Sequence, residues 1–285
     1  MHRATILVVL AAAAGGLAAA QEAGSGRLTV SFTDPSRPGT VRCHIVQGDI
    51  VVAAYEGKDV IVETGRRRQK GGSGLTIRRS GEREPPQPPA PPAGPPLPLA
   101  IGRPGMTVEE QNNAVTVSMD MAGRNSNLRI QVPASTSLDL RTVNGRLLVE
   151  GVAGEIQAQA INGSVQLIDI MGPVVAHSVN GSLKAVFARV PHDKPMSFSS
   201  LNGSIDATFP ADLKANLSIR SGHGEVYSDF DITLKSDSKA VVEDKRAEGG
   251  KYRARLDSSV NGVINSGGPE LRFKAFNGKI YLRKK

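Results

Sequence analysis

The chain has 285 residues, with 35 Lys and Arg against 27 Asp and Glu, which gives a formal net charge of +8. A single cysteine, Cys43, excludes an intrachain disulfide, so core burial and backbone hydrogen bonds must hold the fold. The alternating apolar residues around Cys43 predict a buried thiol, with an intermolecular disulfide as the alternative. Aromatic residues make up only 4% and tryptophan is absent, which argues against a sandwich with a large aromatic core.

Residues 1–20 have the pattern of a secretory signal peptide. A short basic start precedes the apolar run from Ile6 to Ala14, and the small residues LAAA lead up to Ala20. Cleavage after Ala20 would leave 285 − 20 = 265 residues. We therefore expect an exported protein of the periplasm, the cell surface or the extracellular space, and export makes nucleic acid an unsuitable partner for its basic residues.

A proline-rich segment divides the mature chain. Residues 85–98 contain nine prolines in fourteen positions, a composition that cannot form a central strand or a helix. We predict an N-terminal β segment over 21–80, a linker or insertion over 81–104, and a repeat domain over 105–285. Short apolar runs separated by Gly, Pro or Asp predict strands in both pieces.

A short phrase recurs along the chain: an apolar residue, an amide residue, Gly, any residue, and another apolar residue. Several successive copies are 18 to 22 residues apart, which is typical of repeat architectures. We expect each copy to form a structural corner. The predicted corners are Gln47-Gly48, Asn144-Gly145, Asn162-Gly163, Asn180-Gly181, Asn202-Gly203, the degenerate His223-Gly224, Asn261-Gly262 and Asn277-Gly278.

Apolar residues also align from one repeat to the next. Leu147, Val165, Leu183 and Ile205 form one such column, and apolar positions alternate within each predicted strand. This alignment favours a β-solenoid with 18–22-residue coils, in which like residues stack and the asparagines form an amide ladder. A β-sandwich or meander, with type I′ turns at the Asn-Gly sites, is the alternative. The corner glycines are expected to have positive φ, as in Gly181.

The export signal, the recurring Asn-Gly phrases and the stretches NLRIQVPASTSLDLRTVNG and VNGSLKA resemble bacterial envelope proteins known as the putative adhesin family. The resemblance covers residues 27–64 and 106–285. It implies a β-solenoid in the cell envelope and gives no mechanism. The proline-rich insertion and His223, which stands where the other repeats have Asn, depart from the pattern.

No catalytic, metal-binding or cofactor-binding motif stands out. The carboxylates do not recur in one column, although glycoside hydrolysis needs two at a defined separation. The histidines lack metal-ligand spacing. We therefore predict a non-catalytic structural or binding protein of the envelope that needs no cofactor. An envelope stress-sensing scaffold and a glycan-active β-helix enzyme are the alternatives.

The basic residues suggest the partners. They cluster at 66–70, at 78–83 and at the C-terminal Arg283-Lys284-Lys285. Anionic envelope polymers or a membrane surface are the expected partners of such clusters in an exported protein. Exposed edge strands at the ends of the stack would also support self-association.

Overall fold

The computed structural model describes residues 27–66, 106–119, 126–235, 240–244, 252–256 and 259–285. Over these residues every regular element is a β-strand, so the expected all-β class is confirmed. The strands form two large mixed sheets and a separate two-stranded sheet made by β19 (Ala240–Asp244) and β20 (Tyr252–Leu256). In the same part of the chain, no helix is long and apolar enough to cross a membrane. The predicted leader (1–20) and linker (81–104) lie outside the described residues.

One large sheet has ten strands. In spatial order they are β1 (Arg27–Ser31), β4 (Asp59–Arg66), β7 (Ser126–Pro133), β3 (Ile50–Tyr55), β9 (Leu147–Glu150), β11 (Val165–Ile170), β13 (Leu183–Phe187), β15 (Ile205–Phe209), β23 (Ile280–Lys284) and β17 (Val226–Ser228). From β7 to β17 neighbouring strands are parallel, whereas β4 and β1 are antiparallel to their neighbours.

The other large sheet has eleven strands. In spatial order they are β18 (Ile232–Leu234), β21 (Ser259–Ile264), β16 (Ala215–His223), β22 (Glu270–Asn277), β14 (Met196–Asn202), β12 (Val174–Asn180), β10 (Ile156–Asn162), β8 (Ser137–Asn144), β2 (Thr40–Gln47), β6 (Ala114–Met119) and β5 (Met106–Gln111). Its neighbours are parallel from β16 to β6, and antiparallel strands flank this block on both sides.

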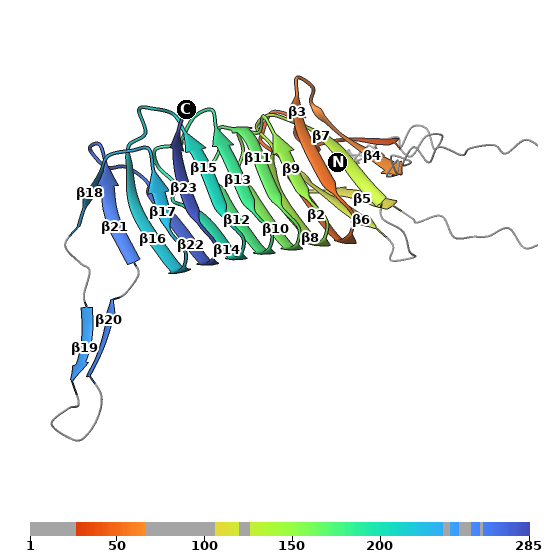
Figure 1. The fold of residues 1–285 in the computed structure, drawn as a ribbon. Helices are drawn as coiled ribbons and strands as arrows, with labels where there is room; N and C mark the ends of the chain where they lie inside the picture. The colour runs from red at the N-terminus through yellow and green to blue at the C-terminus, as the bar shows by residue number, and fades with distance from the viewer. Residues whose placement is uncertain (1–26, 67–105, 120–125, 236–239, 245–251, 257–258) are drawn as a thin grey trace, which may run out of the picture.

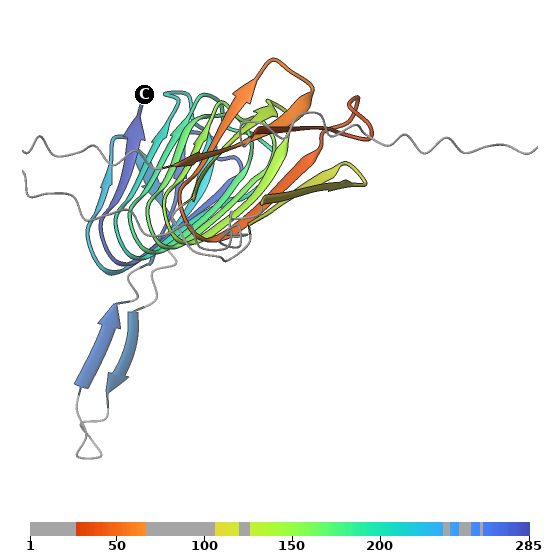
Figure 2. The ribbon, with the colours of Figure 1, turned by 90° about the vertical axis from the view of Figure 1, so that its right-hand side faces the viewer.

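The chain alternates between the two sheets in a regular way. From β8 to β15, each strand in the eleven-stranded sheet is followed by one in the ten-stranded sheet (Figure 1). We call such a pair of consecutive strands, for example β10 and β11, a repeat unit. Viewed along the row of units, the two sheets face each other across a shared interior (Figure 2). Residues 18 apart lie in register, as Val165 does with Leu183, so the sequence columns are columns in space.

Repeat units do not follow one another in space in the order of the sequence. The unit β22–β23 lies between β14–β15 and β16–β17, because β22 pairs with both β14 and β16. Asn202 is therefore in register with Asn277, and not with His223 of the next repeat in sequence. The unit β2–β3 is placed in the same way, between β6–β7 and β8–β9. The strands within residues 27–66 consequently share the two large sheets with strands from 126–235 and 259–285, although the proline-rich segment separates them in sequence.

The core lies between the sheets and consists mostly of aliphatic side chains that alternate with outward ones along each strand. Four phenylalanines form an aromatic cluster within it. Phe198 stacks on Phe273 and Phe187 on Phe209, both at 5.0 Å between ring centroids, and edge contacts join the two pairs. Phe273 belongs to β22, so this cluster helps to fix the inserted unit between its neighbours.

The inward columns should dominate stability. Leu183 is fully buried, so Leu183→Ala should lower the free energy of unfolding by about 2–5 kcal/mol. The adjacent Lys184 is exposed, and Lys184→Ala should change it by no more than about 0.5 kcal/mol. Chemical denaturation of both variants measures the difference. Equal stabilities would remove Leu183 from the core.

Candidate functional site

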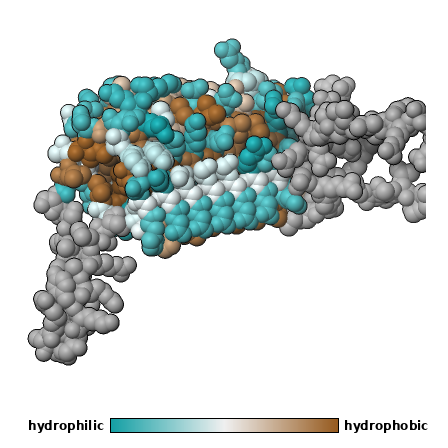
Figure 3. Space-filling view, in the orientation of Figure 1, coloured by the Kyte–Doolittle hydropathy of each residue, from teal (hydrophilic) through white to brown (hydrophobic). Residues whose placement is uncertain are grey.

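The asparagines of five predicted corners form a continuous amide ladder. Each side-chain N–H donates to the side-chain oxygen of the asparagine in the preceding unit, and every one of these hydrogen bonds is 2.9 Å long. The ladder consists of Asn144, Asn162, Asn180, Asn202 and Asn277. In Figure 3 a straight hydrophilic row with a paler row beside it runs along the lower edge of the units. Stacked amides of this kind require the units to be in register.

The glycine after each asparagine is required by a close approach of two backbones. A Cβ at Gly181 would lie 2.2 Å from the carbonyl oxygen of Gly163, and one at Gly163 would lie 1.8 Å from that of Gly145. The expected positive φ is wrong for Gly181, since Gly48 is the corner glycine with a positive φ in the described part of the chain. Glycine is therefore needed here because no side chain fits between stacked corners.

A column of buried hydroxyls supports the same corners from inside. The hydroxyl of Ser178 donates to the carbonyl oxygen of Gly163 at 3.1 Å, and that of Ser200 to Gly181 at 3.3 Å. Thr142 makes the equivalent bond to Gly48 of its neighbouring unit, whereas Ser221 donates to the carbonyl oxygen of Gly224 in its own corner. These four side chains are buried, and each one gives a corner carbonyl a hydrogen-bond partner within the protein.

Three of the predicted corners differ from this pattern. Gln47 is in register with Asn144, and His223 is in register with Asn277, where its ring meets the edge of Phe276 at 5.4 Å between centroids. Asn261 and Gly262 lie inside β21, antiparallel to β16, so the corner predicted there is wrong. The phrase is ambiguous at this site because a strand with apolar residues on one face produces the same local pattern.

The thiol of Cys43 lies in the core. Its side chain is fully buried, and desolvation raises the pKa of the thiol to about 12. A thiol with such a pKa stays protonated near neutral pH and behaves as a small apolar side chain. This supports the reading of Cys43 as a core residue over its reading as an exposed intermolecular link.

A shallow hollow lies over the first corners, lined by glycines of three units together with Asn127, Asn144 and Asn162. The Arg146–Asp49 ion pair, with 2.9 Å between nitrogen and oxygen, lies at this hollow. The hydrogen bonds that Arg146 donates to the Asp49 carboxylate raise the pKa of the guanidinium above its ordinary value. The two charges therefore compensate each other at this point.

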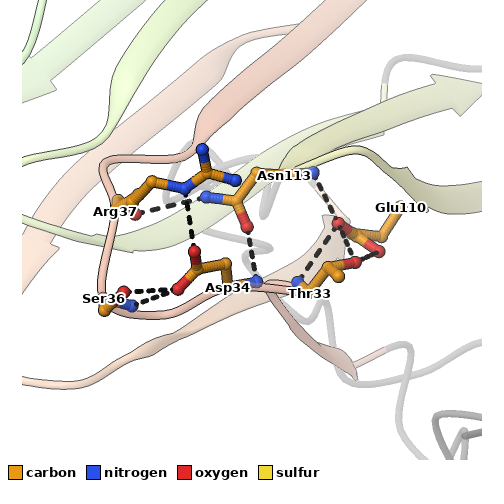
Figure 4. A network of polar contacts seen from close by, with 6 residues as sticks. All are labelled: Thr33, Asp34, Ser36, Arg37, Glu110 and Asn113. Carbon is orange, nitrogen blue, oxygen red and sulfur yellow. Dashed lines mark hydrogen bonds and ion pairs between the residues drawn. The ribbon is translucent and has the colours of Figure 1, made fainter.

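A polar network joins the loop after β1 to the β5–β6 hairpin (Figure 4). Asn113, which has a φ of 65° in the hairpin turn, accepts from the backbone N–H of Asp34 and donates to the carbonyl of Arg37. Glu110 accepts from the hydroxyl of Thr33. Hydrogen bonds from Ser36 lower the pKa of the Asp34 carboxyl, with a smaller contribution from Arg37. The network links residues far apart in sequence at the N-terminal end of the sheets.

On the outer face of the ten-stranded sheet, opposite charges face each other. Glu63 is in register with both Arg27 and Arg129, and Lys184 is in register with Asp206. Asp206 also accepts from Arg283 at 2.9 Å. Opposite charges on neighbouring strands stabilise a sheet, so this face is balanced.

On the outer face of the eleven-stranded sheet, Arg220 of β16 is directly in register with Lys274 of β22. Both side chains are exposed, and neither makes an ion pair or side-chain hydrogen bond with another described residue. We call these two residues the cationic pair. Their other in-register neighbours are Ser259 and Ser199, which are uncharged. Like charges directly opposite are destabilising, so an anionic group placed here would relieve a repulsion.

Two of the carboxylates on the outer faces of the sheets lie against basic side chains. Asp139 lies against Arg141 and His44, and Asp206 against Arg283. Among the described residues no group of three or more His, Cys, Asp or Glu side chains is arranged to hold a metal ion.

Sequence reasoning predicted that the basic clusters bind the anionic partner. Most of 66–83 lies outside the described residues, and at the C-terminus Arg283 pairs with Asp206 and Lys285 with Asp169. It missed the cationic pair because Arg220 and Lys274 are 54 residues apart (274 − 220) and meet only through the insertion of β22. The outward positions of two aligned strands are the signal that could have found them.

Comparisons with known proteins add little. No family model matches the chain, and no curated protein matches it. A solved structure from Clostridium sporogenes ATCC 15579, described as a putative cell adhesion protein, is 8% identical with a TM-score of 0.41. The match covers 91% of this chain and 99% of that one. A likeness at this level carries no argument about function.

The close approach at the corners makes a direct prediction. Gly181→Ala should lower the free energy of unfolding by about 1–3 kcal/mol, because the added Cβ forces stacked backbones apart. The neighbouring Ser182 is exposed, and Ser182→Ala should change it by no more than about 0.5 kcal/mol. Denaturant titration of both variants measures their free energies of unfolding. A Gly181→Ala protein as stable as the Ser182→Ala protein would contradict the close stacking of the corners.

The polar network predicts a dependence on pH. Because the pKa of Asp34 is lowered by folding, its ionised form stabilises the fold above the ordinary value of 3.8, and this contribution disappears as pH falls through the lowered pKa. Ser36→Ala should move the pKa of Asp34 up towards 3.8. Carboxyl NMR titration measures both proteins, with Ser182→Ala as the control. A wild-type pKa at or above 3.8 would refute the assignment.

Proposed function

We propose that this chain is an exported, non-catalytic binding protein of the bacterial cell envelope, folded as a β-solenoid, that binds anionic groups of the envelope, whether on a polymer or on a membrane surface. The observation that carries the proposal is the exposed cationic pair, Arg220 and Lys274, in register on the outer face of the eleven-stranded sheet. In this proposal each repeat unit is one coil of the solenoid. The sequence supports export through residues 1–20.

The solenoid interpretation is supported by the way in which the units stack. Consecutive strands lie in different sheets, and the strands that pair with one another are parallel and in register over β8 to β15. Asparagine, glycine and hydroxyl columns all follow the same axis. A stack of this kind presents long, straight rows of outward side chains, which suits the recognition of an extended partner.

The location of the binding surface follows from the contrast between the two outer faces. The ten-stranded sheet matches Lys184 with Asp206 and Arg129 with Glu63. The eleven-stranded sheet instead sets Lys274 beside Arg220, with Arg272 two residues away and held to Glu270 at 2.6 Å. An anionic polymer that lies across β16 and β22 would supply the missing counter-charge.

A non-catalytic role is supported by the pairing of the carboxylates. A pair of acids for hydrolysis needs one free carboxylate and one with a raised pKa. Asp49, Asp139 and Asp206 each form an ion pair with an arginine. Glu225 and Glu270 have lowered pKa values, through hydrogen bonds from Tyr227 and Arg272 respectively.

A matched charge-removal experiment tests the proposal. The double variant Arg220→Gln/Lys274→Gln, made in residues 21–285, should bind an anionic polysaccharide about tenfold more weakly than wild type. The control, Arg129→Gln/Lys184→Gln, removes two exposed cations from the other face and should keep most of the affinity. Wild-type binding should weaken with salt.

Measurements on the same samples can also contradict the proposal. Equal loss of affinity in both double variants would mean that net charge, and not this face, decides binding. Absence of wild-type binding to both the anionic polysaccharide and anionic lipid vesicles at low salt would refute the proposed function. Release of shortened polysaccharide would show an enzyme, which product analysis of each sample detects.

A further inference from the structure

A row of apolar side chains crosses the outer face of the eleven-stranded sheet beside the amide ladder. Each member directly precedes a corner residue and points outward. Four members are exposed by 41–47%, namely Val46, Ile161, Leu201 and Phe276. Val143 and Val179 lie between them with intermediate exposure. We call these six residues the apolar row.

The apolar row is straight because the units that carry it are in register. Asn162 is in register with both Asn144 and Asn180, and Asn202 with both Asn180 and Asn277, so the residues before them align as well. Six positions on adjacent parallel strands extend over about 24 Å. The other outward positions of these strands are mostly polar, as with Gln157 and Gln159 of β10, and Val175 of β12 is the exposed apolar exception that lies outside the row.

The apolar row and the cationic pair lie on the same face. Phe276 and Lys274 are two residues apart on β22, so their side chains project on the same side of the sheet. Leu201 is next to Phe276 on the adjoining strand β14. The face therefore combines exposed apolar groups with cations that have no anionic partner among the described residues.

We infer that this face binds flat on an anionic lipid bilayer, with the apolar row in the headgroup–acyl boundary and the cationic pair against lipid phosphates. The inference rests on the proposed function, because the same cations take the anionic groups, and it names lipid as their source. A straight row of side chains can meet a planar surface along its whole length. Proteins that bind at bilayer interfaces combine these two kinds of contact.

The combination of cations and apolar side chains favours a lipid surface over a soluble polyanion or a second copy of the chain as the partner of this face. A soluble polyanion would satisfy Arg220 and Lys274 but would leave Ile161, Leu201 and Phe276 in water. A second copy that docks through the same face would bring further unpaired cations to it. An anionic bilayer covers both features at once.

The absence of tryptophan from the sequence provides a sharp probe. A Leu201→Trp variant carries one fluorophore in the apolar row, and a Leu234→Trp variant carries one at a leucine of β18 that is 68% exposed and outside the row. Both are made in residues 21–285 and mixed with phosphatidylglycerol–phosphatidylcholine vesicles. Leu201→Trp should show a blue-shifted emission and quenching by brominated lipid, whereas Leu234→Trp should show neither.

The controls separate failure of this inference from failure of the proposed function. Adding Arg220→Gln/Lys274→Gln to Leu201→Trp should weaken vesicle binding at least about tenfold, and pure phosphatidylcholine should give no shift. Binding to anionic polysaccharide with no shift on any vesicle would overturn the lipid assignment and leave the proposed function standing. A shift that grows with protein concentration without vesicles would also overturn it, in favour of a second copy.

Discussion

The close approach of one corner backbone to the next is the constraint on which the rest of the structure depends. A Cβ at each stacked corner glycine from Gly145 to Gly278 would lie within 1.8–2.2 Å of the carbonyl oxygen in the neighbouring unit. Only glycine allows this spacing, and the spacing holds the units in register. The amide ladder, the buried hydroxyls, the inward apolar columns and the outward rows all follow from that register.

The order of the units in space gives the first and last repeat units neighbours on either side. The first unit, β2–β3, and the last, β22–β23, each lie one place in from an end of the stack. Antiparallel strands then flank the eleven-stranded sheet at both ends, through β5 and β21, and the ten-stranded sheet at the N-terminal end, through β4. Such flanking strands limit the exposed parallel edges at which sheets of different molecules pair.

Much of the core could be predicted from the sequence, because columns such as Val165 and Leu183 align in sequence and in space. The position of β22 in the sheet could not be predicted. Its inward residues Leu271, Phe273 and Ala275 alternate with outward residues as in every other strand of the sheet, and their distance in sequence does not tell which strands they pair with. The prediction of a corner at Asn261 was wrong for a related reason, because an Asn-Gly phrase can also lie within a strand. The cationic pair forms only because β22 is inserted beside β16, so local sequence motifs could not predict the candidate site.

The proposed surface thus exists only if β22 lies between β14 and β16. Amide-to-amide NOEs in deuterated residues 21–285 test this order most directly, since adjacent strands bring backbone amides close together. We predict contacts of Lys274 with both Ser199 and Arg220, its in-register neighbours. A direct contact between Ser199 and Arg220, without Lys274 between them, would contradict the account.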